Sequence, residues 1–138
     1  MSIETWKNEF YPVSARQAAG STLKALEHSL RKWEGLRKMN LKKHGLISMH
    51  CSAEIFEKDS SAHFNITTTT CALCERFFAS PSHRESCCKG CPLSIRKGAF
   101  GCGKDSAYDM WTLTGNPTRM INKLRKAIAA EKARLNAR

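Results

Sequence analysis

The sequence predicts an α+β fold in which a zinc module lies between two helical ends. Three observations lead to this prediction. Apolar residues recur at helical spacing in 1–45 and 103–138, β-branched residues gather within 46–70, and paired cysteines occupy 71–102. A chain of 138 residues has the length of one compact domain. We therefore expect a single zinc-stapled domain that spans 1–138.

A long helical segment is expected across residues 1–45. Ser14 and Gln17 have the spacing of a capping box, in which each side chain satisfies a backbone N–H of the other residue. Gly20 is a candidate break within this segment, and Gly45 is a candidate C-terminal glycine. The apolar residues that follow the box at helical spacing are Leu23, Leu26, Leu30, Trp33 and Leu41.

A small β-hairpin is expected across residues 46–70. The segment 64–70 is rich in β-branched residues with partial alternation, which is typical of a strand, and the polar run 57–61 is typical of a turn. We expect the hairpin to lead directly into the first cysteine pair. Two shorter segments also have β character, 47–51 and 54–56.

A basic amphipathic helix is expected within residues 103–138. Asn116 and Pro117 have the residue types of an N-cap and a first helical position, and a shorter helix over 106–113 is expected to end near Gly115. The apolar face of the longer helix comprises Met120, Ile121, Leu124, Ala127, Ile128 and Leu135. Its basic side chains are Arg119, Lys123, Arg125, Lys126, Lys132 and Arg134.

Two C-x₂-C pairs form the predicted zinc site. Thirteen residues separate the pair Cys71 and Cys74 from the pair Cys88 and Cys91. Each pair can turn so that both thiolates reach one ion, and two such pairs complete a tetrahedral Cys₄ set. We therefore predict that these four cysteines bind one Zn²⁺ ion. A closed, all-thiolate set leaves no coordination position for water, which favours a structural role over catalysis.

Other residues remain alternative ligands. Cys102 lies between two glycines, and this flexible setting makes it the first substitute. Cys87 ranks after it because it is adjacent to Cys88, and His83 would complete a Cys₃His site. An iron–sulfur cluster is disfavoured because the tight C-x₂-C-x₂-C spacing is missing, and a redox C-x-x-C because no α/β unit is expected around it.

Most of the positive charge lies outside the cysteine-rich middle of the chain. The formal net charge is +11, and basic and acidic groups number nine and four in 1–50, six and five in 51–102, and eight and three in 103–138. This distribution predicts a polyanionic partner, in the first place nucleic acid, that contacts the two helical ends. The cations expected on the binding surface are Arg31, Lys32, Lys38, Lys42, Lys43, Arg119, Lys123 and Lys126.

The leading alternative is a protein that binds an acidic surface of another protein. An apolar patch flanked by positive charge would suit that role, with Phe77, Phe78, Phe100, Met110 and Trp111 as its candidate residues.

A zinc-stapled HNH-like nuclease is a further alternative. Such an enzyme needs a His general base, often beside Asp, yet no Asp-His pair occurs in the chain. Its candidate residues are His50, His63, His83 and Asn116. No Gly-rich phosphate loop or H-E-x-x-H helix is present, so we expect a non-catalytic protein without a small-molecule substrate.

Neither a secretory signal nor an apolar run of about 18 residues is recognisable in the sequence. We therefore expect a cytoplasmic protein with no membrane partner, and a reducing compartment in which paired cysteines more often bind metal than form disulfides.

The cysteine pattern resembles a motif of small proteins from tailed bacteriophages. The resemblance covers about 40 residues, from the first C-x₂-C pair through Cys91-Pro92-Leu93 and Gly101-Cys102 to Trp111. It implies a phage product in the bacterial cytoplasm, either a nucleic-acid accessory or an inhibitor of a host or defence protein. It also implies that Cys102 is a zinc ligand and that one cysteine of a pair is not.

Overall fold

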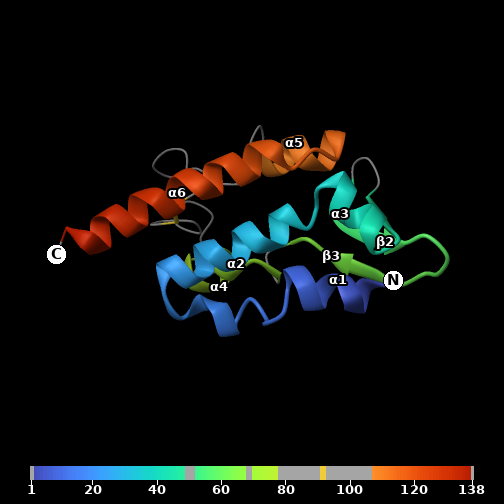
Figure 1. Ribbon diagram of the computed structural model, residues 1–138, viewed down its shortest axis with the longest axis horizontal. Coiled ribbons are helices and arrows are strands. Elements are labelled where there is room, and N and C mark those ends of the chain that lie inside the picture. The colour runs from blue at the N-terminus through green and yellow to red at the C-terminus, as the bar shows by residue number, and fades with distance from the viewer. Residues whose placement is uncertain (1, 49–51, 68–69, 78–90, 93–106, 138) are drawn as a thin grey trace, which may run out of the picture.

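The computed structural model describes residues 2–48, 52–67, 70–77, 91–92 and 107–137 (Figure 1). These residues form helices and a small three-stranded antiparallel sheet, which confirms the α+β class. In chain order the elements are α1 (Ile3–Phe10), the 3₁₀ turn η1 (Gln17–Gly20), α2 (Thr22–Glu34), α3 (Lys38–Lys43), β1 (Leu46–Ser48), β2 (Glu54–Glu57), β3 (His63–Asn65), α4 (Ala72–Phe77), α5 (Ala107–Thr114) and α6 (Thr118–Asn136).

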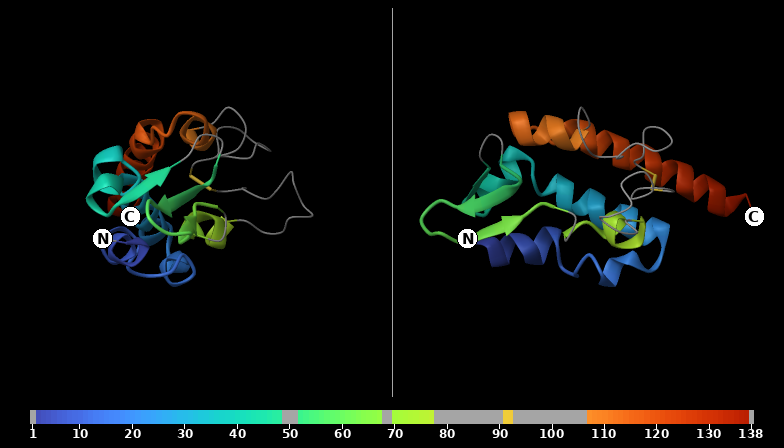
Figure 2. Two further views of the ribbon diagram at one scale, coloured as in Figure 1. Left: turned by 90° about the vertical axis from the view of Figure 1, so that its right-hand side faces the viewer. Right: turned by 180° about the vertical axis from the view of Figure 1, so that it is seen from behind.

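Helix α2 occupies the centre of the molecule. The long helix α6 runs antiparallel along one side of α2, while α1, η1 and α4 pack on its other side (Figures 1 and 2). The sheet lies at the end of α2 that leads into α3 (Figure 1). Among the helices that the structure describes, none combines the length and the apolar character needed to span a bilayer.

The N-terminal segment is helical but divided. The predicted capping box forms, because Ser14 N donates to Gln17 Oε1 at 2.9 Å and Gln17 N donates to Ser14 Oγ at 3.2 Å. The box lies at the start of the short turn η1 only. A separate cap begins α2, where Ser21 Oγ accepts from Lys24 N at 3.1 Å. The expected break at Gly20 is thus confirmed. Helix α1 precedes the box and lies within the segment 1–45 that was expected to be helical.

A second break separates α2 from α3. The apolar spacing predicted one helix through Leu41, but α2 ends at Glu34. Gly35 lies against α1, where a Cβ atom would come within 2.5 Å of Phe10 Cγ, and its carbonyl accepts a hydrogen bond from Trp6 Nε1 at 2.8 Å. Gly45 has a φ of 70° just after α3, as expected of a C-terminal glycine.

The expected hairpin contains a third strand. The strand order is β1-β2-β3, with Leu46 opposite Glu57 in the first pair and Ile55 opposite Phe64 in the second. Of the predicted polar turn 57–61, residues 58–61 lie in the connection from β2 to β3, and Glu57 is the last residue of β2. The predicted strand 64–70 is too long, because β3 ends at Asn65 and Thr70 Oγ1 turns back to donate to Asn65 O at 2.8 Å.

The C-terminal helix packs its apolar face on α2. Met120, Ile121, Leu124 and Ile128 are buried, as the spacing predicted. Leu135 was wrongly included in this face: it is 40% exposed, on the part of α6 that extends beyond α2 (Figure 1). The expected cap shifts by one residue, since Pro117 is the N-cap and Asn116 Oδ1 accepts from Thr118 N at 3.0 Å.

Candidate functional site

The first cysteine pair lies at the start of helix α4. Cys71 immediately precedes the helix, and Cys74 occupies its first turn. The backbone N–H of Cys74 donates to Cys71 Sγ at 3.4 Å, and that of Glu75 donates to Cys71 O at 3.0 Å. Ala72 and Leu73, between the two cysteines, are buried in the core and hold this turn in place. The C-x₂-C spacing therefore brings both sulfur atoms to one side of a helical turn.

Cys71 is poised to be a thiolate. The pKa of Cys71 is lowered to about 5, chiefly by the hydrogen bond from the Cys74 thiol. Burial opposes this shift, whereas the Lys32 ammonium and the backbone N–H groups of Leu73 and Cys74 also lower the pKa. A thiolate is the form of cysteine that binds metal ions. The donor chemistry of this pair therefore fits a zinc site.

Lys32 lies in the core beside this pair, and its assignment to the exposed binding surface was wrong. Its side chain is among the largest that are fully buried, and Nζ donates to Thr70 O at 3.0 Å. The ammonium also lies 5.9 Å from the centre of the Trp33 ring. Ser29 and Ala25, one and two turns earlier on α2, are buried on the same face, and these small residues were the overlooked signal that another segment packs there.

The remaining predicted zinc ligands are only partly described. Cys91 is half-buried and packs against the hydrophobic core, as Cys71 does. Within the described ranges, no three His, Cys, Asp or Glu side chains are grouped to hold a metal. The other predicted or alternative ligands, His83, Cys87, Cys88 and Cys102, lie outside the described residues.

The predicted basic residues form separate groups rather than one surface. Arg31 and Lys43 flank α1, where Arg31 Nε donates to Glu9 O at 2.6 Å and Lys43 Nζ lies 3.1 Å from Glu9 Oε2. Lys38 and Lys42 are exposed on α3. On α6, Arg119 and Lys126 are exposed and Lys123 is half-buried.

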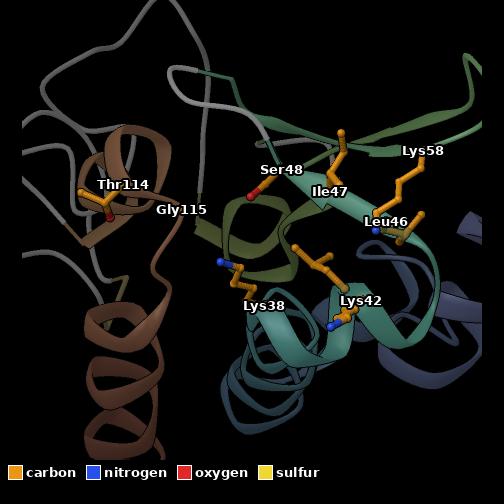
Figure 3. A pocket seen from close by; sticks show the side chains of 9 residues that line it. Lys38, Lys42, Leu46, Ile47, Ser48, Lys58, Thr114 and Gly115 are labelled. Atoms are coloured by element: carbon orange, nitrogen blue, oxygen red, sulfur yellow. The ribbon is translucent and has the colours of Figure 1, made fainter.

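The α3 lysines border a pocket of about 460 Å³ (Figure 3). Its walls come from α3, β1, the residue that follows β2, and the turn between α5 and α6. Its cationic members are Lys38, Lys42 and Lys58. Lys58 was not among the predicted binding residues because it belongs to a segment that was expected only to form a turn.

Comparison with known proteins adds no relative. No protein-family model matches the chain, and neither the curated proteins nor the solved structures contain a significant match. The resemblance to phage cysteine-cluster proteins therefore stays a prediction.

The residues of the alternative functions are dispersed. Trp111 is buried and packs edge-on against Trp33, with ring centres 5.2 Å apart, so it is not available to a partner protein. Met110 is 36% exposed and Phe77 is half-buried, whereas Phe78 and Phe100 lie outside the described residues. Of the nuclease candidates, His63 is exposed on β3, and His50 and His83 are not described.

Proposed function

We propose that this protein is a non-catalytic, zinc-stabilised nucleic-acid-binding protein. Lysine and arginine side chains of α3 and α6 contact the phosphate backbone. The observation that carries the proposal is a set of exposed cations for which the described part of the chain provides no carboxylate within ion-pair distance: Lys38, Lys42, Arg119 and Lys126.

Several carboxylates are engaged with other cations, which supports this assignment. Glu9 pairs with Lys43 and with His44, whose Nε2 atom lies 2.8 Å from Glu9 Oε1. Glu34 pairs with Arg125 at 2.8 Å. The positive charge left on α3 and α6 is therefore accessible to phosphate groups, which Lys and Arg bind with release of counterions.

The proposed zinc ion has a structural role. Cys71 and Cys74 supply two thiolates, and two more come from Cys88, Cys91 or Cys102. Such a site ties α4, which packs on α2, to the residues that follow it in the chain. Structural zinc sites contribute on the order of 10 kcal/mol of folding free energy. The buried ammonium of Lys32 offsets part of the negative charge that an all-thiolate site carries.

Salt-dependent fluorescence anisotropy tests the nucleic-acid function. The probe is a labelled single-stranded or duplex oligonucleotide of about 20 nucleotides or base pairs, titrated at several salt concentrations. Four neutralised phosphates on a single strand predict a slope of about −3 for log K against log salt. Lys42→Ala should reduce affinity, while Lys43→Ala, which removes a cation already paired with Glu9, is the matched control. Absence of binding at low salt and micromolar protein refutes the function.

A second candidate function is inhibition of another protein by binding to an acidic surface of that protein. Exposed apolar side chains near the cationic region favour it, namely Met39 on α3, which is 79% exposed, and Leu113 on α5, which is 51% exposed. Capture of one stoichiometric partner that survives nuclease treatment, together with loss of capture in Met39→Ser, would favour this function over nucleic-acid binding.

A further inference from the structure

The pocket beside α3 combines an apolar floor with a cationic rim. Leu41 and Leu46 are buried, and Ile47 is 39% exposed; all three contribute to the lining. Lys38 and Lys42 are one helical turn apart on α3, and Lys58 borders the pocket from the residue after β2 (Figure 3). No carboxylate belongs to the described lining of this pocket. Three like charges around one hollow repel one another, so an anion placed among them lowers the electrostatic free energy.

The backbone holds the walls of the pocket in place. Lys58 N donates to Gly45 O at 3.2 Å, which fixes the end of β2 against the end of α3. On the opposite wall, Gly115 has a φ of 75°, and a Cβ atom built on it would lie 3.5 Å from Ser48 Oγ. The end of β1 and the turn between α5 and α6 are therefore close together. The positive φ favours glycine at position 115, and glycine places no side chain at this point of the wall.

The size and chemistry of the pocket suit one nucleotide. Its volume of about 460 Å³ lies within the common range for small-ligand sites, about 300 to 1,000 Å³. A duplex keeps its bases stacked inside, so its phosphates can reach only the rim. A single strand can turn a nucleotide outward, so that its phosphates meet the lysines while its sugar or base covers the apolar floor.

We propose that this pocket binds an unstacked nucleotide of a single-stranded nucleic acid. Phosphate groups contact Lys38, Lys42 and Lys58, and the sugar or base packs on the aliphatic floor. This assignment rests on the nucleic-acid function proposed above and adds a preference for single strands. It also predicts weak sequence preference. The aliphatic side chains of the lining read no base edge, and the Thr114 hydroxyl already donates to Met110 O at 2.7 Å, so the Ser48 hydroxyl is the remaining neutral polar side chain of the described lining.

Charge-reversal variants locate the binding site. The pocket variant is Lys38→Glu with Lys58→Glu, and the control variant is Arg16→Glu with Lys24→Glu, which lie outside α3 and α6. All four positions are exposed, and both variants change the net charge equally. With labelled oligothymidine as the probe, we expect at least a tenfold loss of affinity in the pocket variant and a smaller loss in the control. Circular dichroism melting verifies that both variants are folded.

A neutral variant tests the floor separately from the charge. Ile47→Ser is expected to weaken oligothymidine binding severalfold and duplex binding less, because Ile47 is 39% exposed and the stacked bases of a duplex cannot cover it.

Three outcomes separate this proposal from the function on which it rests. If the unaltered protein binds neither single strands nor duplexes, the nucleic-acid function itself fails. Tighter binding of duplex than of oligothymidine overturns the pocket assignment and leaves the function standing. An equal loss of affinity in the pocket and control variants likewise overturns the pocket assignment and leaves the function standing.

Discussion

The buried ammonium group of Lys32 donates a hydrogen bond to the backbone carbonyl of Thr70 at a distance of 3.0 Å. The two residues lie on segments far apart in the sequence, α2 and the turn before α4. A buried ammonium is costly unless it is paired. Here the Thr70 carbonyl, the Trp33 ring and the nearby Cys71 sulfur offset that cost. Lys32 thus holds the first cysteine pair against α2.

Replacement of Lys32 by alanine should destabilise the protein by about 2 to 4 kcal/mol, because it opens a cavity and leaves the Thr70 carbonyl without this donor. Lys24→Ala is the matched control, since Lys24 is exposed on the same helix and should cost less than about 0.5 kcal/mol. Urea unfolding measures both free energies. Equal values for the two variants would show that Lys32 is not a core residue.

Alanine substitutions at Gly35 and Gly20 test whether close packing against α1 requires glycine at position 35. Gly35→Ala should lower the free energy of unfolding by about 1 to 3 kcal/mol, because its Cβ atom would lie 2.7 Å from Phe10 Cβ and force α1 away from α2. Gly20→Ala has no atom within 4 Å of the added Cβ and should change stability by less than about 0.5 kcal/mol. Thermal melting of both variants checks the difference, and a Gly35→Ala protein as stable as Gly20→Ala contradicts it.

His28 should make the protein less stable in mild acid. Burial lowers the pKa of His28 below 6.5, and the charges of Lys32 and Arg31 lower it further, against the hydrogen bond with Val13. Nε2 lies 2.8 Å from Val13 O, while buried Nδ1 has no hydrogen-bond partner among the described residues. Protonation of the folded protein is therefore unfavourable.

The unfolded chain consequently binds this proton more readily than the folded protein. The contribution of His28 is fully present above about pH 6.5, the pKa of an unperturbed histidine, and is lost as the pH falls below that value towards the lowered pKa of the folded protein. Urea unfolding across this pH range measures the effect. His28→Gln should flatten this part of the curve, and an unchanged slope would assign the pH dependence to other groups.

Metal analysis tests the proposed zinc ion. We expect one zinc per chain, and Cys71→Ser should lose the metal and unfold or aggregate. Ser60→Ala is a suitable control because Ser60 is exposed in the turn after β2. Comparison of Cys87→Ser with Cys102→Ser identifies which thiol is spare. A folded, metal-free protein that melts cooperatively would overturn the zinc assignment.

Local features of the chain were predictable from the sequence. The Ser14–Gln17 capping box, the left-handed Gly45 and the buried stripe of α6 depend on residues within one or two helical turns. The α+β class follows from the same local patterns. The C-x₂-C spacing likewise indicated that Cys71 and Cys74 lie on one turn, because three intervening peptide bonds limit how far their side chains can separate.

Contacts between distant segments were decided only by the tertiary structure. A helical pattern ranks Lys32 as polar, and only the packing of the turn before α4 against α2 buries it. Gly35 ends α2 because Phe10 of another helix occupies the space beside it. Lys38 and Lys58 share a pocket because β2 and α3 meet at Gly45. The sequence alone therefore determined the local caps, the turns and the amphipathic stripe of α6. The packing of these elements against one another determined which cations are buried and which remain available to a partner.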